Sequence, residues 1–318
     1  MITETRYRHG DEKGNQPFGY HCCHLPWPNF DGRHCYGGSV SGATLVILAA
    51  GRARRYGGLK QLAPIGWHRE GVIDLLASDA VAAGFGDIVM VVNHDTGPTI
   101  MEHVKAHWPT DITVSFTYQE SLRGTVDAVL SARHLIDPSK PFAISNADDL
   151  YGPDAFAKMA AHLANTSNSC LVAYRLENSL IGDLPVSRGV CTVDGGRLVT
   201  VTERRNVTMT PEGCSADDGL EPQYLEDTSL VSMNLWGFQP ELWPALQRAV
   251  EEHNFDESAE VLLPTFVATV MERDNVVFDV LTTPSRCIGV THADDLPLAQ
   301  FLVREEIKQG LRPERAFS

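Results

Sequence analysis

Positive charge is scarce in this sequence of 318 residues: 26 Lys and Arg stand against 41 Asp and Glu, which leaves a formal net charge of −15. A strongly acidic surface repels the phosphates of nucleic acids and lipid headgroups, so we expect the protein to bind neither nucleic acid nor membrane. Cysteine is also sparse. The seven cysteines, an odd number without framework spacing, argue against a disulfide scaffold and fit reduced thiols in a cytoplasmic protein.

Long apolar stretches are missing as well. No apolar run reaches about 18 residues, so the sequence predicts no membrane-spanning helix. The N-terminus lacks the charged start and the apolar stretch of a secretory signal. Because 43% of the residues are hydrophobic, the chain can still bury a large core. We therefore expect a soluble cytoplasmic protein, and the composition leaves open whether it forms a homo-oligomer.

Residues 1–42 differ in composition from the rest of the chain. They are rich in Gly, Pro, His and aromatic residues and show the periodicity of neither a strand nor a helix. Their His and Cys residues match no tetrahedral zinc spacing. The sequence predicts an irregular N-terminal extension here, followed by one domain over residues 43–318.

Buried strands and helices alternate from Thr44 to about residue 176. Helical patterns separate apolar runs at 44–50, 87–93, 112–118, 142–145 and 170–174. This alternation predicts an α/β fold with a doubly wound, mainly parallel, Rossmann-like sheet. Ligands of such sheets bind at the carboxyl ends of the strands.

The alternation ends after about residue 176, where a smaller β region begins. Strand patterns at 189–193 and 198–202 predict a hairpin. Residues 207–227 contain six acidic residues and no Lys or Arg, so we expect a mobile surface loop there.

A basic segment directly follows the first strand. Between Thr44 and Arg69 there are five basic residues and no acidic one. Arg and Lys at the mouth of a parallel sheet, with glycines that let backbone N–H groups approach a ligand, predict a polyphosphate site. A Walker loop needs Ser or Thr where Gln61 stands, and a dinucleotide fingerprint needs a glycine where Ala53 stands, so both motifs are disfavoured.

The end of this strand, Leu48-Ala49-Ala50-Gly51, followed by Arg55 and Lys60, resembles the signature of a known family. The family is the sugar-1-phosphate nucleotidyltransferases, or pyrophosphorylases, which make nucleoside-diphosphate sugars. The resemblance implies the nucleotide-diphospho-sugar transferase type of fold. It also implies that Leu48, Ala49, Ala50 and Gly51 bind the nucleotide and that Arg55 and Lys60 are catalytic.

Two further segments resemble the family in the same order. Residues 118–126 look like its base-reading segment, which implies nucleotide contacts from Gln119, Gly124 and Thr125. Residues 145–152 resemble the segment with the metal-binding Asp, which implies a catalytic Asp148 that binds Mg²⁺. The residues themselves support a cation here, because adjacent carboxylates at a strand end repel each other unless they share one.

The second half of the chain resembles the family more loosely. Residues 188–190 and 201–205 look like the segments that hold the sugar and its phosphate, and residues 231–234 like the strand that closes the sugar pocket. The resemblance thus implies a nucleotide-binding part at about 43–176 and an acceptor-binding part at about 177–310. Relatives place a second metal ligand in the segment that here contains Gly289 and Thr291, neither of which supplies a carboxylate. The acceptor-binding residues implied are Gly189, Glu203, Arg204 and Asn234.

The resemblance implies an enzyme that joins a nucleoside triphosphate to a sugar 1-phosphate by Mg²⁺-assisted in-line attack on the α-phosphate, with release of pyrophosphate. A glycosyltransferase with a metal-binding Asp pair is also open, although it would not need the Arg and Lys loop for a triphosphate. Two further alternatives stay open. One is a cytidylyltransferase that acts on a phosphonate or a phosphocholine-like acceptor. The other is a regulatory protein that binds a nucleotide sugar without turning it over.

Overall fold

The computed structural model describes residues 42–51, 58–210, 213–253, 260–290 and 292–318. Almost all of the predicted N-terminal extension, and Arg55 with it, lies outside these residues. The four cysteines in the described part of the chain are free and buried. None of the helices described there is long and apolar enough to cross a membrane.

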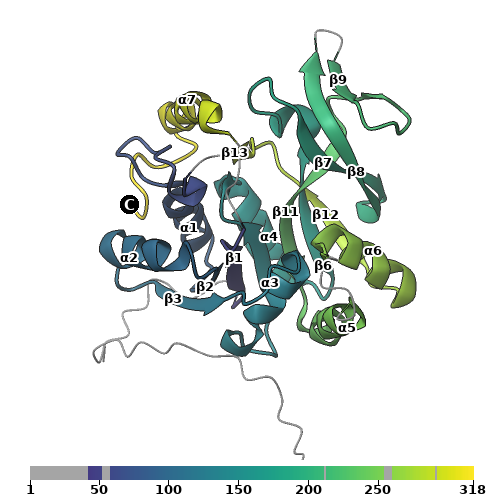
Figure 1. Cartoon of the computed structure of the whole chain (residues 1–318), viewed down its shortest axis with the longest axis horizontal. Helices are drawn as coiled ribbons and strands as arrows, with labels where there is room; N and C mark the ends of the chain where they lie inside the picture. The colour runs from purple at the N-terminus through teal and green to yellow at the C-terminus, as the bar shows by residue number, and fades with distance from the viewer. Residues whose placement is uncertain (1–41, 52–57, 211–212, 254–259, 291) are drawn as a thin grey trace, which may run out of the picture. The chain divides into compact units, whose positions relative to one another are not determined.

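The first four long strands form the parallel part of the main sheet, in the order β3-β2-β1-β4 (Figure 1). Their central residues are apolar because both faces of the sheet are covered; Leu45, Val46 and Ile47 of β1 are fully buried. The strands are β1 (Thr44–Leu48), β2 (Asp87–Val92), β3 (Thr113–Tyr118) and β4 (Phe142–Asn146).

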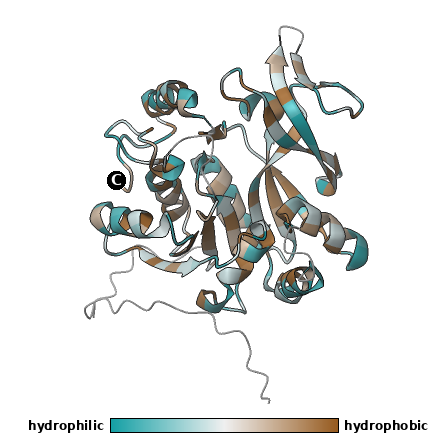
Figure 2. Ribbon diagram, viewed as in Figure 1, coloured by the Kyte–Doolittle hydropathy of each residue, from teal (hydrophilic) through white to brown (hydrophobic). Residues whose placement is uncertain are grey.

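Helices pack on both faces of this sheet, in two separate hydrophobic clusters. The first cluster includes α1 (Val72–Ala82), α2 (Gly97–His107), α4 (Pro153–Asn165) and α7 (Leu296–Lys308). The second includes α3 (Thr125–Ser131), α5 (Trp243–His253) and α6 (Leu263–Arg273). Figure 2 shows hydrophobic residues concentrated on the central strands and both hydrophobic and hydrophilic residues on the surrounding helices.

The sheet as a whole is mixed, so the prediction of a mainly parallel sheet holds only for its first four strands. β11 runs antiparallel between β4 and β6, and β12 is parallel to β6. A buried apolar run looks alike in either direction, which is why the sequence pattern did not reveal the reversal. These strands are β6 (Ser169–Arg175), β11 (Leu230–Phe238) and β12 (Phe278–Thr282).

The predicted hairpin is present and longer than expected, formed by β7 (Val186–Asp194) and β8 (Arg197–Thr210). The surface loop predicted at 207–227 is wrong, because β8 continues into this region and pairs with β9 (Gly213–Ala216), which pairs with β10 (Tyr224–Leu225). Two acidic residues here bond within the protein. Asp218 pairs with Arg204, and Asp227 accepts a hydrogen bond from the Cys214 backbone N–H at 3.1 Å.

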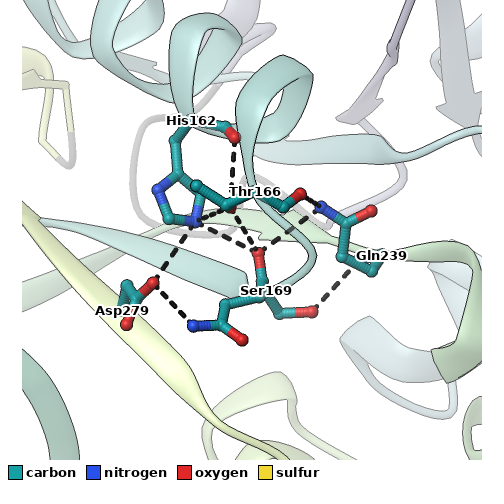
Figure 3. Close-up of polar contacts among 6 residues, drawn as sticks. His162, Thr166, Ser169, Gln239 and Asp279 are labelled. Carbon is teal, nitrogen blue, oxygen red and sulfur yellow. Dashed lines mark hydrogen bonds and ion pairs between the residues drawn. The ribbon is translucent and has the colours of Figure 1, made fainter.

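A polar network fixes the amino ends of β6 and β12 (Figure 3). The Gln239 backbone N–H donates to Ser169 Oγ at 3.1 Å, and Asn168 Nδ2 donates to Asp279 Oδ2 at 3.0 Å. His162 Nε2 lies 3.1 Å from the Asn168 carbonyl oxygen. Since β6 runs in the same direction as β4, this network lies at the edge opposite the carboxyl end of β4, and it ties α4 to the sheet.

Candidate functional site

Two cavities meet at the carboxyl end of β4. The larger, of about 750 Å³, extends from the end of β1 and is called the β1 cavity. The smaller, of about 260 Å³, is lined by residues of β7, β8 and β11 and is called the β7 cavity. Asn146 and Asp148 line both. A ligand in one cavity therefore lies next to a ligand in the other.

The β1 cavity brings together most of the residues predicted to bind the nucleotide: Leu48, Ala50, Gly51, Gln119, Gly124 and Thr125 all line it, and so does Lys60, which was predicted to be catalytic. Ala49 is buried, and its N–H donates to the Val91 carbonyl at 2.8 Å. Asn93 Nδ2 donates to the Ala50 carbonyl at 2.8 Å. These two hydrogen bonds fix the end of β1 against β2, so the backbone that faces the cavity is held in place.

A lysine and a carboxylate meet where the two cavities join. Lys60 begins a short 3-10 helix (Lys60–Leu62), and its Nζ donates to Asp148 Oδ2. Both side chains are 22% exposed, so the pair is open to a ligand on one side. The neighbouring Gln61 also lines the β1 cavity, and its buried Oε1 has no hydrogen-bond partner in the described part of the chain.

The two adjacent carboxylates have different surroundings. Burial, together with the negative charge of Asp148, raises the pKa of Asp149 to about 6. Asn146 Nδ2 donates to Asp149 Oδ2 at 2.9 Å and partly opposes the shift. Asp148 instead faces both cavities and Lys60, which makes it the more accessible carboxylate for a cation.

The oxygen donors present fit a magnesium ion that is held jointly by protein and substrate. Among the described residues, no group of three or more His, Cys, Asp or Glu side chains is placed to hold a metal. Mg²⁺ usually takes only one or two protein carboxylates and completes its octahedron with water and phosphate oxygens. Gly289 supplies no carboxylate, and a Cβ there would lie 2.4 Å from Asp149 Oδ1, so a larger residue would displace that carboxylate. Thr291 lies outside the described residues.

Gln119 presents an acceptor atom to the β1 cavity. Its Nε2 donates to the Gly124 carbonyl at 3.0 Å and to Asp127 Oδ2 at 2.9 Å. Both partners are acceptors, so the amide orientation is fixed by chemistry. Oε1 has no partner in the described part of the chain and remains able to accept a hydrogen bond from a ligand.

Gly124 and Thr125 hold a distant segment against this cavity. Gly124 has φ of +100°, and a Cβ there would lie 2.4 Å from the Val261 carbonyl oxygen. Thr125 Oγ1 accepts a hydrogen bond from the Leu263 backbone N–H at 2.8 Å. This segment supplies Glu260 and Leu262 to the cavity lining, two residues that the sequence analysis missed. No local pattern could have revealed them, because they follow Gly124 by more than a hundred residues.

The β7 cavity brings together three of the four residues predicted to bind the acceptor: Gly189, Glu203 and Asn234 line it. Gly189 of β7 pairs with Glu203 of β8 and with Ser232 of β11. Asn234 has φ of +59° and lies where the pairing of β11 with β6 shifts register, between Ser232 and Trp236. At this irregular point β11 contributes Asn234 to the cavity that β7 and β8 also line.

Arg204, the fourth predicted acceptor residue, does not line either cavity. Its Nε and Nη2 donate to Asp218 at 2.7 and 3.0 Å, and Nη2 also donates to the Leu220 carbonyl at 3.0 Å. The Arg204 guanidinium holds the pKa of Asp218 well below its usual range. Arg204 is the register partner of Arg188 in the hairpin of β7 and β8, so its pairing with Asp218, and not strand parity, separates it from the cavity. The structure therefore corrects the expectation that Arg204 holds the acceptor.

Several lining residues were not predicted to bind a ligand. Asn146 lines both cavities, and its place two residues before Asp148 is the one sequence signal that could have indicated it. The β7 cavity also contains Arg188 from the start of β7. The remaining lining residues of that cavity without a predicted role are Asp149, Ser187, Val201, Ser232, Met233, Pro264 and Gly289.

Comparison with known proteins now identifies the class. Residues 44–201 match the nucleotidyl transferase family, a span that begins with β1 and ends within β8. It therefore includes the basic segment, Gln119, Asp148 and Gly189. The fold and the site define an enzyme that transfers nucleotidyl groups. The chain belongs to the nucleotidyl transferase family, as its resemblance to the nucleotidyltransferases predicted.

Solved structures share the fold over most of the chain. The inositol-1-phosphate CTP transferase from T. maritima is 12% identical and has a TM-score of 0.62, over 85% of this chain and 98% of that one. A putative glucose-1-phosphate thymidylyltransferase from Bacillus anthracis, solved with a sucrose, is 12% identical, with a TM-score of 0.62 over 83% and 96% of the two chains. A UDP-glucose pyrophosphorylase complexed with UDP-glucose is 16% identical, with a TM-score of 0.58 over 83% and 99%. The predicted nucleotide-diphospho-sugar transferase type of fold is confirmed. No curated protein matches the chain in sequence.

Proposed function

We propose that the enzyme joins a nucleoside triphosphate in the β1 cavity to a sugar 1-phosphate in the β7 cavity, with release of pyrophosphate. The observation that carries this proposal is that the two cavities share Asn146 and Asp148. Nucleotidyl transfer needs an α-phosphate and an acceptor phosphate side by side, and the shared wall offers that place.

Catalysis in this proposal depends on position and charge. The acceptor phosphate is ionised near neutral pH and needs no general base, whereas the two phosphates repel each other. Preorganised positive groups that offset this repulsion are the main source of rate enhancement. Lys60 lies at the junction of the cavities, and a bound triphosphate would offer its ammonium a phosphate oxygen in place of Asp148. Arg55 would hold the departing pyrophosphate.

Asp148 would hold the magnesium ion, which supplies positive charge at the α-phosphate when bound. Asn146 and Asp149 would support it from the side of the β7 cavity, since they hydrogen-bond to each other at 2.9 Å. Gln119 Oε1 would accept an N–H from the base edge. The hydrogen bonds of its Nε2 hold that oxygen in position before the nucleotide arrives.

The β7 cavity suits a polyhydroxylated acceptor. Its polar lining consists largely of amide, hydroxyl and carboxylate groups, which bind sugar hydroxyls, and its volume of about 260 Å³ suits a compact molecule. The solved relatives include proteins named for inositol 1-phosphate and for glucose 1-phosphate. No aromatic side chain of the described residues lines this cavity, so a choline-like acceptor would lack a cation–π partner there.

The test is a matrix of four nucleoside triphosphates against sugar 1-phosphates, inositol 1-phosphate, phosphonates and phosphocholine, with Mg²⁺, scored by pyrophosphate release. We expect pyrophosphate only where a triphosphate and a sugar or cyclitol phosphate are present together, in equal amount with the nucleotide sugar. The Lys60→Ala variant is the matched control for contaminating activity. Release with phosphonates or phosphocholine alone would favour the alternative acceptor class. No release with any pair would refute the proposal.

A further inference from the structure

The β7 cavity contains one cation among its described lining residues. The charged residues that line it are Asp148, Asp149 and Glu203, which are acidic, and Arg188. An acceptor phosphate brought into such a cavity meets net negative charge, so at least one positive group must face it. Arg204, which the sequence suggested for this role, is occupied by Asp218.

Arg188 is held in a fixed position without a carboxylate partner. Its Nε donates to Ser179 Oγ at 3.1 Å, its Nη2 to the Ser179 carbonyl, and its Nη1 to the Ser187 carbonyl at 2.7 Å. Ser179 is itself fully buried and donates to the Leu176 carbonyl at 2.8 Å. These bonds hold the planar guanidinium in one orientation, which lowers the entropic cost of binding a ligand.

The guanidinium retains donors for a ligand. Arginine has five N–H groups, and the three bonds to Ser179 and Ser187 leave two without a protein partner among the described residues. Arg188 also forms no ion pair within 4.0 Å with a described carboxylate. Burial lowers the pKa of Arg188, and the charge of Asp149 opposes this shift. An incompletely compensated, partly buried guanidinium is a strong site for a phosphate.

We propose that Arg188 binds the phosphate of the acceptor and aligns it for attack, an assignment that rests on the proposed function. Arg188 precedes Gly189 in β7, and the absence of a side chain at Gly189 leaves the cavity open beside it: a Cβ there would lie 2.9 Å from Val201 Cγ1. Arg188 acts in this proposal as a positioning residue for the acceptor. Glu203 of the same cavity then faces the sugar hydroxyls, and Asp148 holds the magnesium ion.

The experiment measures KM for each substrate with the acceptor that the wild-type enzyme turns over in the matrix above. We expect Arg188→Gln to raise the acceptor KM by roughly 10- to 150-fold, the loss of a charge-assisted hydrogen bond, with little change in the KM of the triphosphate. Arg188→Lys keeps the positive charge and loses the planar guanidinium, so it should retain part of the affinity for the acceptor. Arg197→Gln is the matched control, since Arg197 is exposed on the same hairpin outside both cavities.

A second readout separates phosphate binding from a structural role. The free sugar that corresponds to the acceptor, used as a competitive inhibitor, should inhibit Arg188→Gln and wild type alike. Equal weakening of the free sugar and the sugar phosphate would overturn the assignment, as would an unchanged acceptor KM. If Arg188→Gln does not fold, Arg188→Lys carries the same comparison. Failure of the wild type with every acceptor would instead refute the proposed function and this assignment with it.

Discussion

The glycine before α3 tests how the β1 cavity is built. Gly124 has φ of +100°, and a Cβ there would lie 2.4 Å from the Val261 carbonyl oxygen and 2.6 Å from its nitrogen. Both of these atoms are hydrogen-bonded: Val126 N–H donates to the Val261 carbonyl at 3.0 Å, and Val261 N–H donates to the Arg123 carbonyl at 2.9 Å. Gly124→Ala should therefore strain the backbone at residue 124 and also displace Val261.

The expected loss of stability has two parts. Placing a residue with a side chain in this backbone region costs about 1–3 kcal/mol. Loss of the two backbone hydrogen bonds of Val261 costs about 0.5–1.5 kcal/mol each. We thus expect Gly124→Ala to lower the free energy of unfolding by about 2–6 kcal/mol. The displaced segment carries Glu260 and Leu262, so the KM of the triphosphate should rise as well.

Gly196→Ala provides the matched control. Gly196 also has a positive φ, +80°, but nothing lies within 4 Å of a Cβ built there. In this variant the free energy of unfolding should fall only by the conformational cost of about 1–2 kcal/mol, and the nucleotide affinity should not change. Urea unfolding followed by tryptophan fluorescence measures the free energy of unfolding of both variants. If Gly124→Ala costs no more than Gly196→Ala, contact with Val261 is not the reason for the glycine.

Three further predictions concern charge and recognition. Asp148→Asn should abolish Mg²⁺-dependent pyrophosphate release with the fold intact, and Asp149→Asn should do less, because Asp148 lines both cavities whereas Asp149 lines only the β7 cavity and already bonds to Asn146; a larger effect of Asp149→Asn would reverse the assignment. Gln119→Ala should compress the ratio of kcat/KM between the best and worst triphosphates, since a site built on hydrogen bonds rejects wrong partners by leaving its groups unpaired; an unchanged ratio would point to backbone recognition. Burial also raises the pKa of Asp79 from 3.8 to about 6 despite Arg312 beside it, so the folded protein binds this proton more tightly than the unfolded chain. Stability should therefore fall as the pH rises through this range, and Asp79→Asn, followed by thermal unfolding at several pH values, should remove that part of the slope.

The nucleotide side of the site could be predicted because its signals are local. The run that ends at Gly51 indicates a buried strand, and Lys60 and Asp148 follow strands whose carboxyl ends lie at one edge of the sheet. The strand order then brings these residues together. These placements needed only the residues of short segments and the general rule for parallel sheets, whereas the roles of the residues came from the family resemblance.

The cation of the acceptor side could not be predicted in the same way. Three arginines, Arg188, Arg204 and Arg205, stand in the two segments that resemble the sugar-binding ones. Strand parity does not separate Arg188 from Arg204, because the two are register partners of β7 and β8. What separates them is Asp218, a partner 14 residues beyond Arg204 that binds its guanidinium. Sequence spacing contains neither the register of β7 against β8 nor this pairing.

The reversed strand β11 explains why the residues of the acceptor side are harder to predict from the sequence. β11 pairs antiparallel with β4, with Trp236 opposite Ile144 and Phe238 opposite Phe142, so its first residues lie beside the carboxyl end of β4. Ser232 and Asn234 reach the β7 cavity from the amino half of a strand. The rule that ligands bind at the carboxyl ends of strands therefore does not identify these two residues. The two cavities are thus lined by strands that run in both directions, and Asn146 at the end of β4 lines both.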